Sequence, residues 1–224
     1  MFNTQGMTAG SGKEKPVIGT GNQKVKINSV TFDQTPYDAN AYNITLHVES
    51  EPMTGEFQGF LLDQNNPNGP RYEGQVGRVR FSPYAYKDTI LPNGNEISRD
   101  NEVMKAMVFL AETLNKRADL DKINANTIEE FMSACNGIFS NSDFVNVCLA
   151  AREWENKEGY INNDLFLPKM SKGNVPIEAL DVESSKLITF DSNNPLHLRK
   201  VVKTDAPATT SFEPTTSSAS DFDL

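Results

Sequence analysis

Basic and aromatic residues alternate in the stretch G-P-R-Y-E-G-Q-V-G-R-V-R-F-S-P-Y-A-Y-K, Gly69 to Lys87. Such residues can bind a single-stranded nucleic acid, because cations attract its phosphates and flat rings stack beneath its unpaired bases, each stack being worth ~1–3 kcal/mol. The candidates in this stretch are Arg71, Tyr72, Arg78, Arg80, Phe81, Tyr84, Tyr86 and Lys87. Since they are two residues apart, Arg78 and Arg80 would lie on one face of a strand. Lys24 and Lys26 would do the same on an earlier strand. The alternative is that the two arginines only solvate the outer face of a sheet, while the aromatic residues pack in the core.

A second aromatic pair, Trp154 and Tyr160, lies on the two sides of an expected turn at 156–159. These rings could stack on bases, or they could pack against each other across the strands of a hairpin. Nearby acids, which would repel phosphate, are Glu153, Glu155 and Glu158. We therefore rank this pair below the first set as a binding site for nucleic acid.

The printed sequence ends with S-S-A-S-D-F-D-L, in which Asp221, Phe222, Asp223 and Leu224 follow a long polar stretch. From Thr204 onward the chain is mostly Thr, Ser, Ala and Pro, a composition that cannot bury enough surface to order itself. Large apolar side chains beside acids predict a short peptide that docks in an apolar pocket with a basic rim. The alternative is an acidic end that only aids solubility.

The charge of the chain argues against a protein coated with bases. With 30 acids against 21 bases, the formal net charge is -9, which disfavours general attraction to nucleic acid. No Lys or Arg follows Lys203, whereas Asp205 and Glu213 add to the acids of the tip. The body is therefore only mildly acidic, and its bases can be gathered on one face.

No known catalytic motif is present. The patterns G-x-S-x-G and H-E-x-x-H and a phosphate loop are missing, and His47 lies in an alternating strand pattern without a partner for acid–base chemistry. The carboxylates that could hold a divalent ion are better explained as a solvated helix end or loop; they are Glu96, Asp100, Glu102, Asp119 and Asp121. We expect no enzyme, no catalytic residues and no cofactor, and a metal-dependent nuclease remains the enzymatic alternative.

The cysteines and the N-terminus bear on the compartment. Cys135 and Cys148 form no C-x-x-C pair and lie far from both histidines in the sequence, so we expect no metal site and a reducing environment. The N-terminus lacks the basic start and apolar core of a signal peptide. No run of ~18 apolar residues could span a membrane. These features predict a cytoplasmic protein that does not contact a membrane.

The candidate residues must be positioned by strands and two helices. Period-two alternation predicts strands near 24–32, 42–48, 56–62 and 77–81, with a bulge where the alternation slips after Ile27. An apolar stripe with helical spacing predicts a helix over 100–116, capped by Ser98 or Asp100. A second helix should begin near Thr127, where T-I-E-E has the spacing of a capping box, and end before Gly137. Strands should return at 145–151, in a hairpin around 156–159, and at 187–190.

This order of elements predicts a mainly β protein, a small antiparallel barrel with a helical insertion, because the crossovers of a parallel sheet would alternate regularly. We expect a flexible arm over 1–22, the barrel over 23–203 with its insertion at about 100–139, and a disordered acidic tail over 204–224.

The layout resembles that of bacteriophage single-stranded-DNA-binding proteins built on an OB-fold. The resemblance is carried by the barrel, by the terminal D-F-D-L, and by the stretches A-R-E-W-E-N-K-E-G-Y and D-L-F-L-P. It implies that the barrel holds DNA, and that the tail recruits replication and recombination proteins and occupies the DNA groove when DNA is absent. It also implies the host cytoplasm as the location. The chain differs from the pattern in ending with Leu224 and in the size of its helical insertion.

We therefore expect a sequence-independent single-stranded-DNA-binding protein whose partners are DNA and, through the tail, replication or recombination proteins. The alternative is a protein-interaction or virion-associated module that binds no DNA, in which the basic and aromatic strip is an ordinary protein interface.

Overall fold

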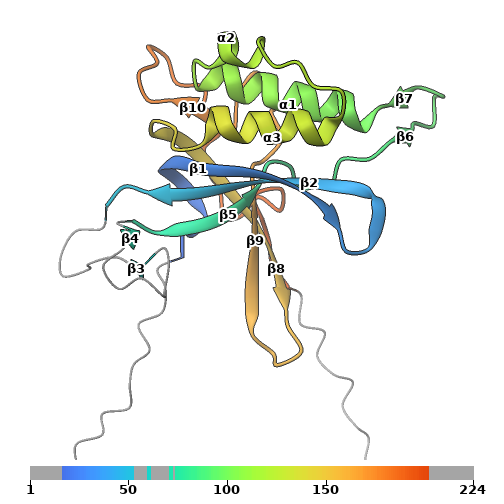
Figure 1. Ribbon diagram of the computed structural model, residues 1–224. Coiled ribbons are helices and arrows are strands. Elements are labelled where there is room, and N and C mark those ends of the chain that lie inside the picture. Colours follow the sequence, from blue (N-terminus) through green and yellow to red (C-terminus); the bar gives the residue numbers. More distant parts are fainter. Residues whose placement is uncertain (1–16, 53–59, 62–70, 73, 202–224) are drawn as a thin grey trace, which may run out of the picture.

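The computed structural model of the chain describes residues 17–52, 60–61, 71–72 and 74–201 (Figure 1). Its strands are β1 (Gly21–Thr35), β2 (Asp38–Ser50), β3 (Phe60–Leu61), β4 (Arg71–Tyr72), β5 (Val76–Arg80), β6 (Thr89–Ile90), β7 (Glu96–Ile97), β8 (Val145–Glu155), β9 (Ile161–Phe166), β10 (Ile177–Ala179) and β11 (Leu198–Arg199). Its helices are α1 (Arg99–Thr113), α2 (Arg117–Leu120) and α3 (Ile128–Phe139).

The main sheet closes on itself. Strands β1, β2, β5, β9 and β8 are hydrogen-bonded in this order, and β8 pairs with β1 where Val145 lies opposite Val25. All of these pairs are antiparallel except that of β5 with β9, which is parallel. A closed barrel of these strands has the arrangement of an OB-fold-like barrel, so the expected fold class is confirmed. Strand β10 pairs with the first part of β8, at Val145–Val147, and β11 pairs with its second part, at Ala151 and Arg152.

The barrel is filled by residues that alternate along its strands. On β2 and β5 the fully buried side chains are Ile44, Leu46 and Val79, and the residues between them point outward. The expected bulge is present, because the pairing of β1 with β2 shifts register between Ile27 and Ser29. The side-chain oxygen of Asn136 in α3 accepts a hydrogen bond from the backbone N–H of Val30 at 2.8 Å, which ties the insertion to the strand just after the bulge.

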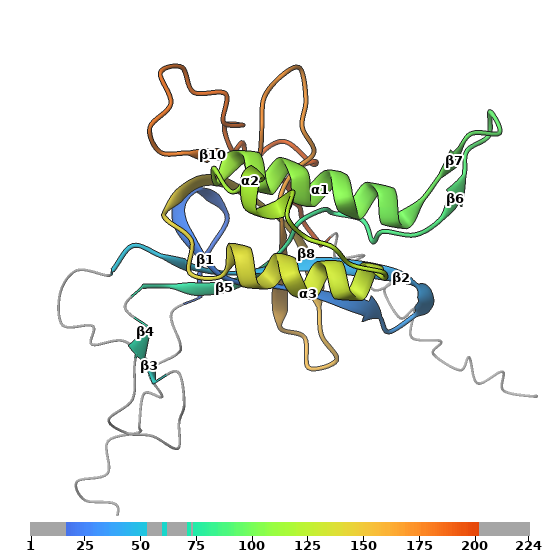
Figure 2. The ribbon, with the colours of Figure 1, turned by 45° about the horizontal axis from the view of Figure 1, so that its top comes forward.

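The helical insertion covers one side of the barrel. Figures 1 and 2 show α1 and α3 beside each other above β1 and β2, while the β8–β9 hairpin extends in the opposite direction. Ser98 caps α1, and its hydroxyl accepts from the backbone N–H of Asn101. Thr127 caps α3 by accepting from the backbone N–H of Glu130. Both helices bury apolar residues in the same core as the strands.

Several expected boundaries differ from the structure. The expected arm over 1–22 is too long, since Ile18 is buried and its N–H donates to the carbonyl of Val76. The second helix passes through Gly137 and ends at Phe139, whose burial continues the apolar face of the helix. The stretch 187–190 forms an isolated bridge with Val175 instead of a strand. The third strand is described only at 60–61, and the rest of its expected range lies outside the described residues.

Candidate nucleic-acid interface

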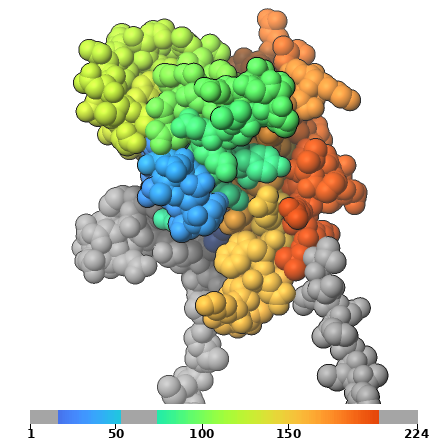
Figure 3. Space-filling view, turned by 90° about the vertical axis from the view of Figure 1, so that its right-hand side faces the viewer, coloured from blue at the N-terminus to red at the C-terminus, as the bar shows by residue number. Residues whose placement is uncertain are grey.

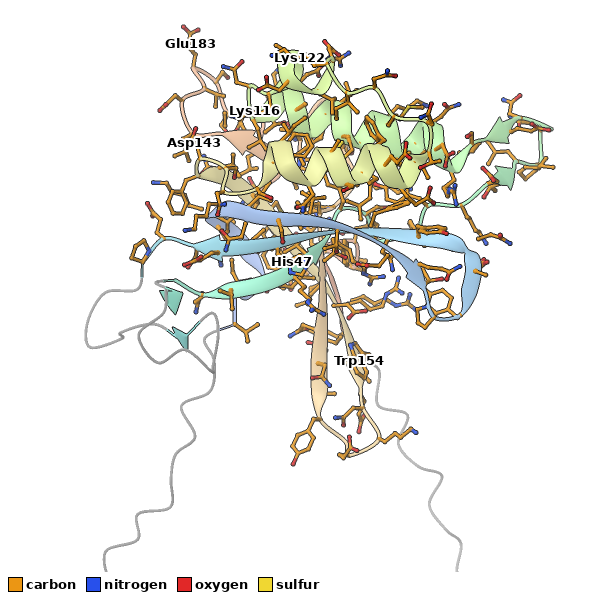
Figure 4. All side chains as sticks on the ribbon, in the orientation of Figure 1. His47, Lys116, Lys122, Asp143, Trp154 and Glu183 are labelled. Atoms are coloured by element: carbon orange, nitrogen blue, oxygen red, sulfur yellow. The ribbon has the colours of Figure 1, made fainter. Side chains whose placement is uncertain are left out.

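The outward residues of β1, β2 and β5 form one continuous surface. His47 lies opposite Ser29 on one side and Arg78 on the other, and Thr45 lies opposite Thr31 and Arg80 in the same way. Because opposite residues in a sheet share a face, the two arginines lie on the outward side of the barrel together with Lys24 and Lys26. We call these four cations and His47 the sheet face. Figure 4 shows His47 on the side of the strands that faces away from the helices.

His47 and Arg78 are electrostatic neighbours on this face. Partial burial is the largest cause of a lowered pKa for the His47 imidazole, and the adjacent Arg78 guanidinium lowers the pKa further, whereas Asp33 raises it. His47 is therefore neutral at neutral pH and becomes a further cation only when the pH falls or when an anion approaches.

Three of the four cations of the sheet face are already paired with carboxylates. Lys24 contacts Glu51 at 2.5 Å, Lys26 contacts Glu49 at 3.5 Å, and Arg80 contacts Asp164 of β9 at 3.1 Å. The side chain of Glu49 is almost fully buried and also accepts hydrogen bonds from Asn28 and from the backbone of Gly74. Arg78 has no ion-pair partner among the residues that the structure describes.

Exposed ion pairs contribute little to stability, typically about 0–1 kcal/mol, so phosphates can replace Glu51 and Asp164 at small cost. The Lys26–Glu49 pair is different, because Glu49 is held from several sides. On the sheet face, Arg78 can therefore bind a phosphate directly. Lys24 and Arg80 can bind one after the phosphate has displaced Glu51 or Asp164.

The β8–β9 hairpin adds exposed rings next to this face. Its turn is the expected one, in which the side-chain oxygen of Asn156 accepts from the backbone N–H groups of Glu158 and Tyr160. Trp154 is 45% exposed and Tyr160 is 69% exposed. In Figure 4 Trp154 lies on the same side of the barrel as His47. The strand opposite Trp154 carries Asn162, so no aromatic residue pairs with the indole directly across the hairpin.

The remaining aromatic candidates lie elsewhere. Phe81 packs edge-on against Phe109 of α1 with ring centroids 6.3 Å apart, and burial raises the pKa of the Tyr86 hydroxyl strongly. Both rings belong to the interior between barrel and helix, as the alternation of Phe81 with Arg80 requires. With Tyr84 and Lys87 they line a hollow of about 750 Å³ beside α1. Lys87 also contacts Asp38 at 3.9 Å.

Tyr84 is the exposed member of this group. Its ring is 61% exposed, and the ammonium of Lys169 lies over it at 4.9 Å from the centroid. Tyr84 also lines a second hollow with Arg152 and Arg199, two cations that no sequence motif indicates. Asp164 was missed as well, since only the pairing of β5 with β9 brings it to Arg80.

Two groups of candidates lie partly or wholly outside the described residues. Arg71 and Tyr72 form the short strand β4, which pairs with β3, and their side chains lie outside the described residues. The tip residues Asp221, Phe222, Asp223 and Leu224 also lie outside them.

The metal-ligating residue types and the two thiols in the described part of the chain are respectively dispersed and buried. No three His, Cys, Asp or Glu side chains there gather closely enough to hold a metal ion. Cys135 and Cys148 are buried and unpaired, and burial raises the pKa of their thiols to about 12 and about 11. Neither thiol is therefore a ready nucleophile at neutral pH. Within the described residues, no helix has the length and apolar character needed to cross a bilayer.

Comparison with known proteins gives no further guide to the site. No protein family matches the chain, and no curated protein has a similar sequence.

Proposed function

We propose that the protein binds single-stranded DNA without sequence preference, across the sheet face and the β8–β9 hairpin, in bacteriophage DNA replication or recombination. The observation that supports the proposal is that Arg78, Arg80, Lys24 and Lys26 lie on one outward face of adjacent strands. In OB-fold barrels the corresponding strands and loops bind oligonucleotides. The phosphates would contact the cations, and the bases would stack on Trp154 and Tyr160.

The ion pairs of the sheet face set the expected strength of binding. A phosphate that contacts Arg80 must displace Asp164, and one that contacts Lys24 must displace Glu51. Each exchange of partners reduces the electrostatic gain by the small free energy of the ion pair, so the affinity should be moderate, and it should fall steeply as salt is added. The rest of the binding free energy would come from stacking of bases on the rings, which salt does not screen.

The acidic tail would regulate this binding. On the sequence alone, we propose that residues 204–224 compete with DNA for the sheet face, and that bound DNA frees the D-F-D-L tip to recruit a replication or recombination protein. A tethered segment reaches roughly millimolar effective concentration. A protein truncated after Lys203 should therefore bind oligothymidine more tightly than the full chain and should lose its partner. Equal DNA affinity of the two proteins would contradict the competition.

The rival is a protein-interaction module that binds no DNA. It is favoured by the net charge of -9 and by the pairing of Lys24, Lys26 and Arg80 with carboxylates. A gel shift of the full chain with oligothymidine at low salt separates the two. A shifted band that disappears with added salt supports the DNA-binding function, and the absence of any shift at low salt favours the rival.

A further inference from the structure

A second hollow lies beside the sheet face, where three distant parts of the chain meet. Its volume is about 490 Å³, and it is lined by the loop after β5, by the outward side of β8 and β9, and by the segments that follow β9 and precede β11. In Figure 3 the yellow β8–β9 hairpin, the green-to-teal segment above it and the red C-terminal segment come together on this side of the molecule. We call this hollow the Tyr84 pocket.

The charge of the Tyr84 pocket is of one sign. Arg152, Lys169, Lys172 and Arg199 line it, and its lining includes no Asp or Glu. None of these four cations forms an ion pair with any residue that the structure describes. On the sheet face, by contrast, three of four cations have carboxylate partners. The chain has more acids than bases, so four cations around one hollow without ion-pair partners among the described residues stand out. An anion could bind to them without displacing a carboxylate.

The walls of the pocket are apolar and partly aromatic. The exposed ring of Tyr84 forms one side, and the exposed side chain of Leu196 contributes at another. Phe166 also lines the hollow. The apolar and aromatic walls fit a flat ring, and the four cations fit an anion. A nucleotide has both parts, a base and a phosphate.

The pocket is continuous with the sheet face. Arg80 contacts Asp164, and Asp164 lies directly opposite Arg152 in the pairing of β9 with β8. Arg152 in turn lies opposite Arg199 of β11. The outward positions of four neighbouring strands thus lead from the sheet face into the pocket, and Asp164 lies between the two groups of cations.

We propose that the Tyr84 pocket binds a nucleotide of the same DNA strand that crosses the sheet face, with Lys172 and Arg199 at its phosphates and the ring of Tyr84 under its base. The inference rests on the proposed function. It extends the interface beyond the face that OB-fold barrels generally use, onto a surface built by the C-terminal segment of this chain.

The test compares two variants of the full chain. The double substitution Lys172→Ala with Arg199→Ala removes two exposed cations of the pocket, and Lys200→Ala, next to Arg199, removes an exposed cation that does not line it. With oligothymidine of about 20 nucleotides, the double variant should bind on the order of ten-fold more weakly, and its salt slope should fall by about 1.4, since each lost phosphate contact of a single strand removes ~0.7. The Lys200 variant should bind as the unchanged protein does.

The measurements distinguish a wrong proposal for the Tyr84 pocket from a wrong proposal for DNA binding by the protein. If the unchanged protein and Lys200→Ala bind oligothymidine, Arg78→Ala weakens binding, and the double variant binds like Lys200→Ala, then DNA crosses the sheet face without entering the pocket. If the double variant keeps its DNA affinity but loses binding of a synthetic peptide that ends in D-F-D-L, then the pocket is a site for acidic peptides and the proposal is wrong. If the unchanged protein binds no DNA at low salt, both the function and the pocket's role in it are overturned.

Discussion

Arg78 lies directly opposite His47 in the pairing of β5 with β2, and both side chains point to the outward side of the barrel. The guanidinium helps to keep the imidazole neutral by lowering its pKa. The pair therefore consists of one permanent cation and one imidazole that becomes a cation when the pH falls or an anion approaches. Both lie on the same face as the Lys24–Glu51 and Arg80–Asp164 ion pairs.

Arg78 should contribute most directly to DNA binding, because it is the cation of the sheet face without a carboxylate partner among the described residues. Arg78→Ala should weaken oligothymidine binding several-fold to about ten-fold and reduce the salt slope by ~0.7. The control is Lys122→Ala, which removes an exposed cation on the helical side in Figure 4. Equal losses in the two variants would mean that only total charge matters, and that the sheet face is not the binding site.

Asp164→Asn should strengthen DNA binding. The change removes the carboxylate that pairs with Arg80 at 3.1 Å and leaves a side chain of the same shape. Because an ion pair at the protein surface is typically worth about 0.2–1 kcal/mol, the affinity for oligothymidine should rise by up to about five-fold in a fluorescence titration. Glu183→Gln, which removes an acid on the helical side in Figure 4, is the matched control. A weaker affinity of the Asp164 variant would show that the acid orients Arg80 and does not compete with DNA.

DNA affinity should depend on pH through His47. Burial and Arg78 lower its pKa in the folded protein, whereas bound phosphate favours the charged imidazole, so binding takes up a proton. Affinity should therefore rise as the pH falls from about 7.5 to about 5.5, across the ordinary His pKa of ~6.5. The substitution His47→Gln should flatten this rise, and an unchanged pH profile would exclude His47 from the interface.

The stability of the protein without DNA should fall as the pH falls, whereas its DNA affinity should rise. A base whose pKa is lower in the folded than in the unfolded state contributes stability above the unfolded pKa, and this contribution is lost as the pH falls through the folded pKa. The Tm of the unchanged protein should therefore fall over the acidic range more than that of His47→Gln. If both proteins lost Tm in parallel, the imidazole would not be desolvated in the folded state.

The parts of the fold that depend on local patterns could be predicted from the sequence. The slip in alternation after Ile27 indicated the bulge, the capping residues Ser98 and Thr127 marked the helix starts, and Asn156 and Gly159 marked the hairpin turn. The period of two also placed Arg78 and Arg80 on one face. These features depend on residues that are near neighbours in the chain.

Features that depend on distant partners could not be predicted. Nothing near Lys24 or Arg80 indicates that Glu51 and Asp164 will neutralise them, because these pairs form only when the barrel closes. The burial of Phe81 and Tyr86 depends on how α1 packs over the barrel. The Tyr84 pocket combines residues from 83 to 199, so no local pattern could reveal it.

DNA binding across the sheet face is tested most directly by the fluorescence of Trp154, the single tryptophan of the chain, during titration of the full protein with oligothymidine at low and at high salt. Stacking of bases on the exposed indole beside the sheet face predicts saturable quenching whose midpoint moves to higher DNA concentration as salt is added. Fluorescence that stays constant at low salt, together with no shift of the oligonucleotide on a gel, would contradict DNA binding across this face.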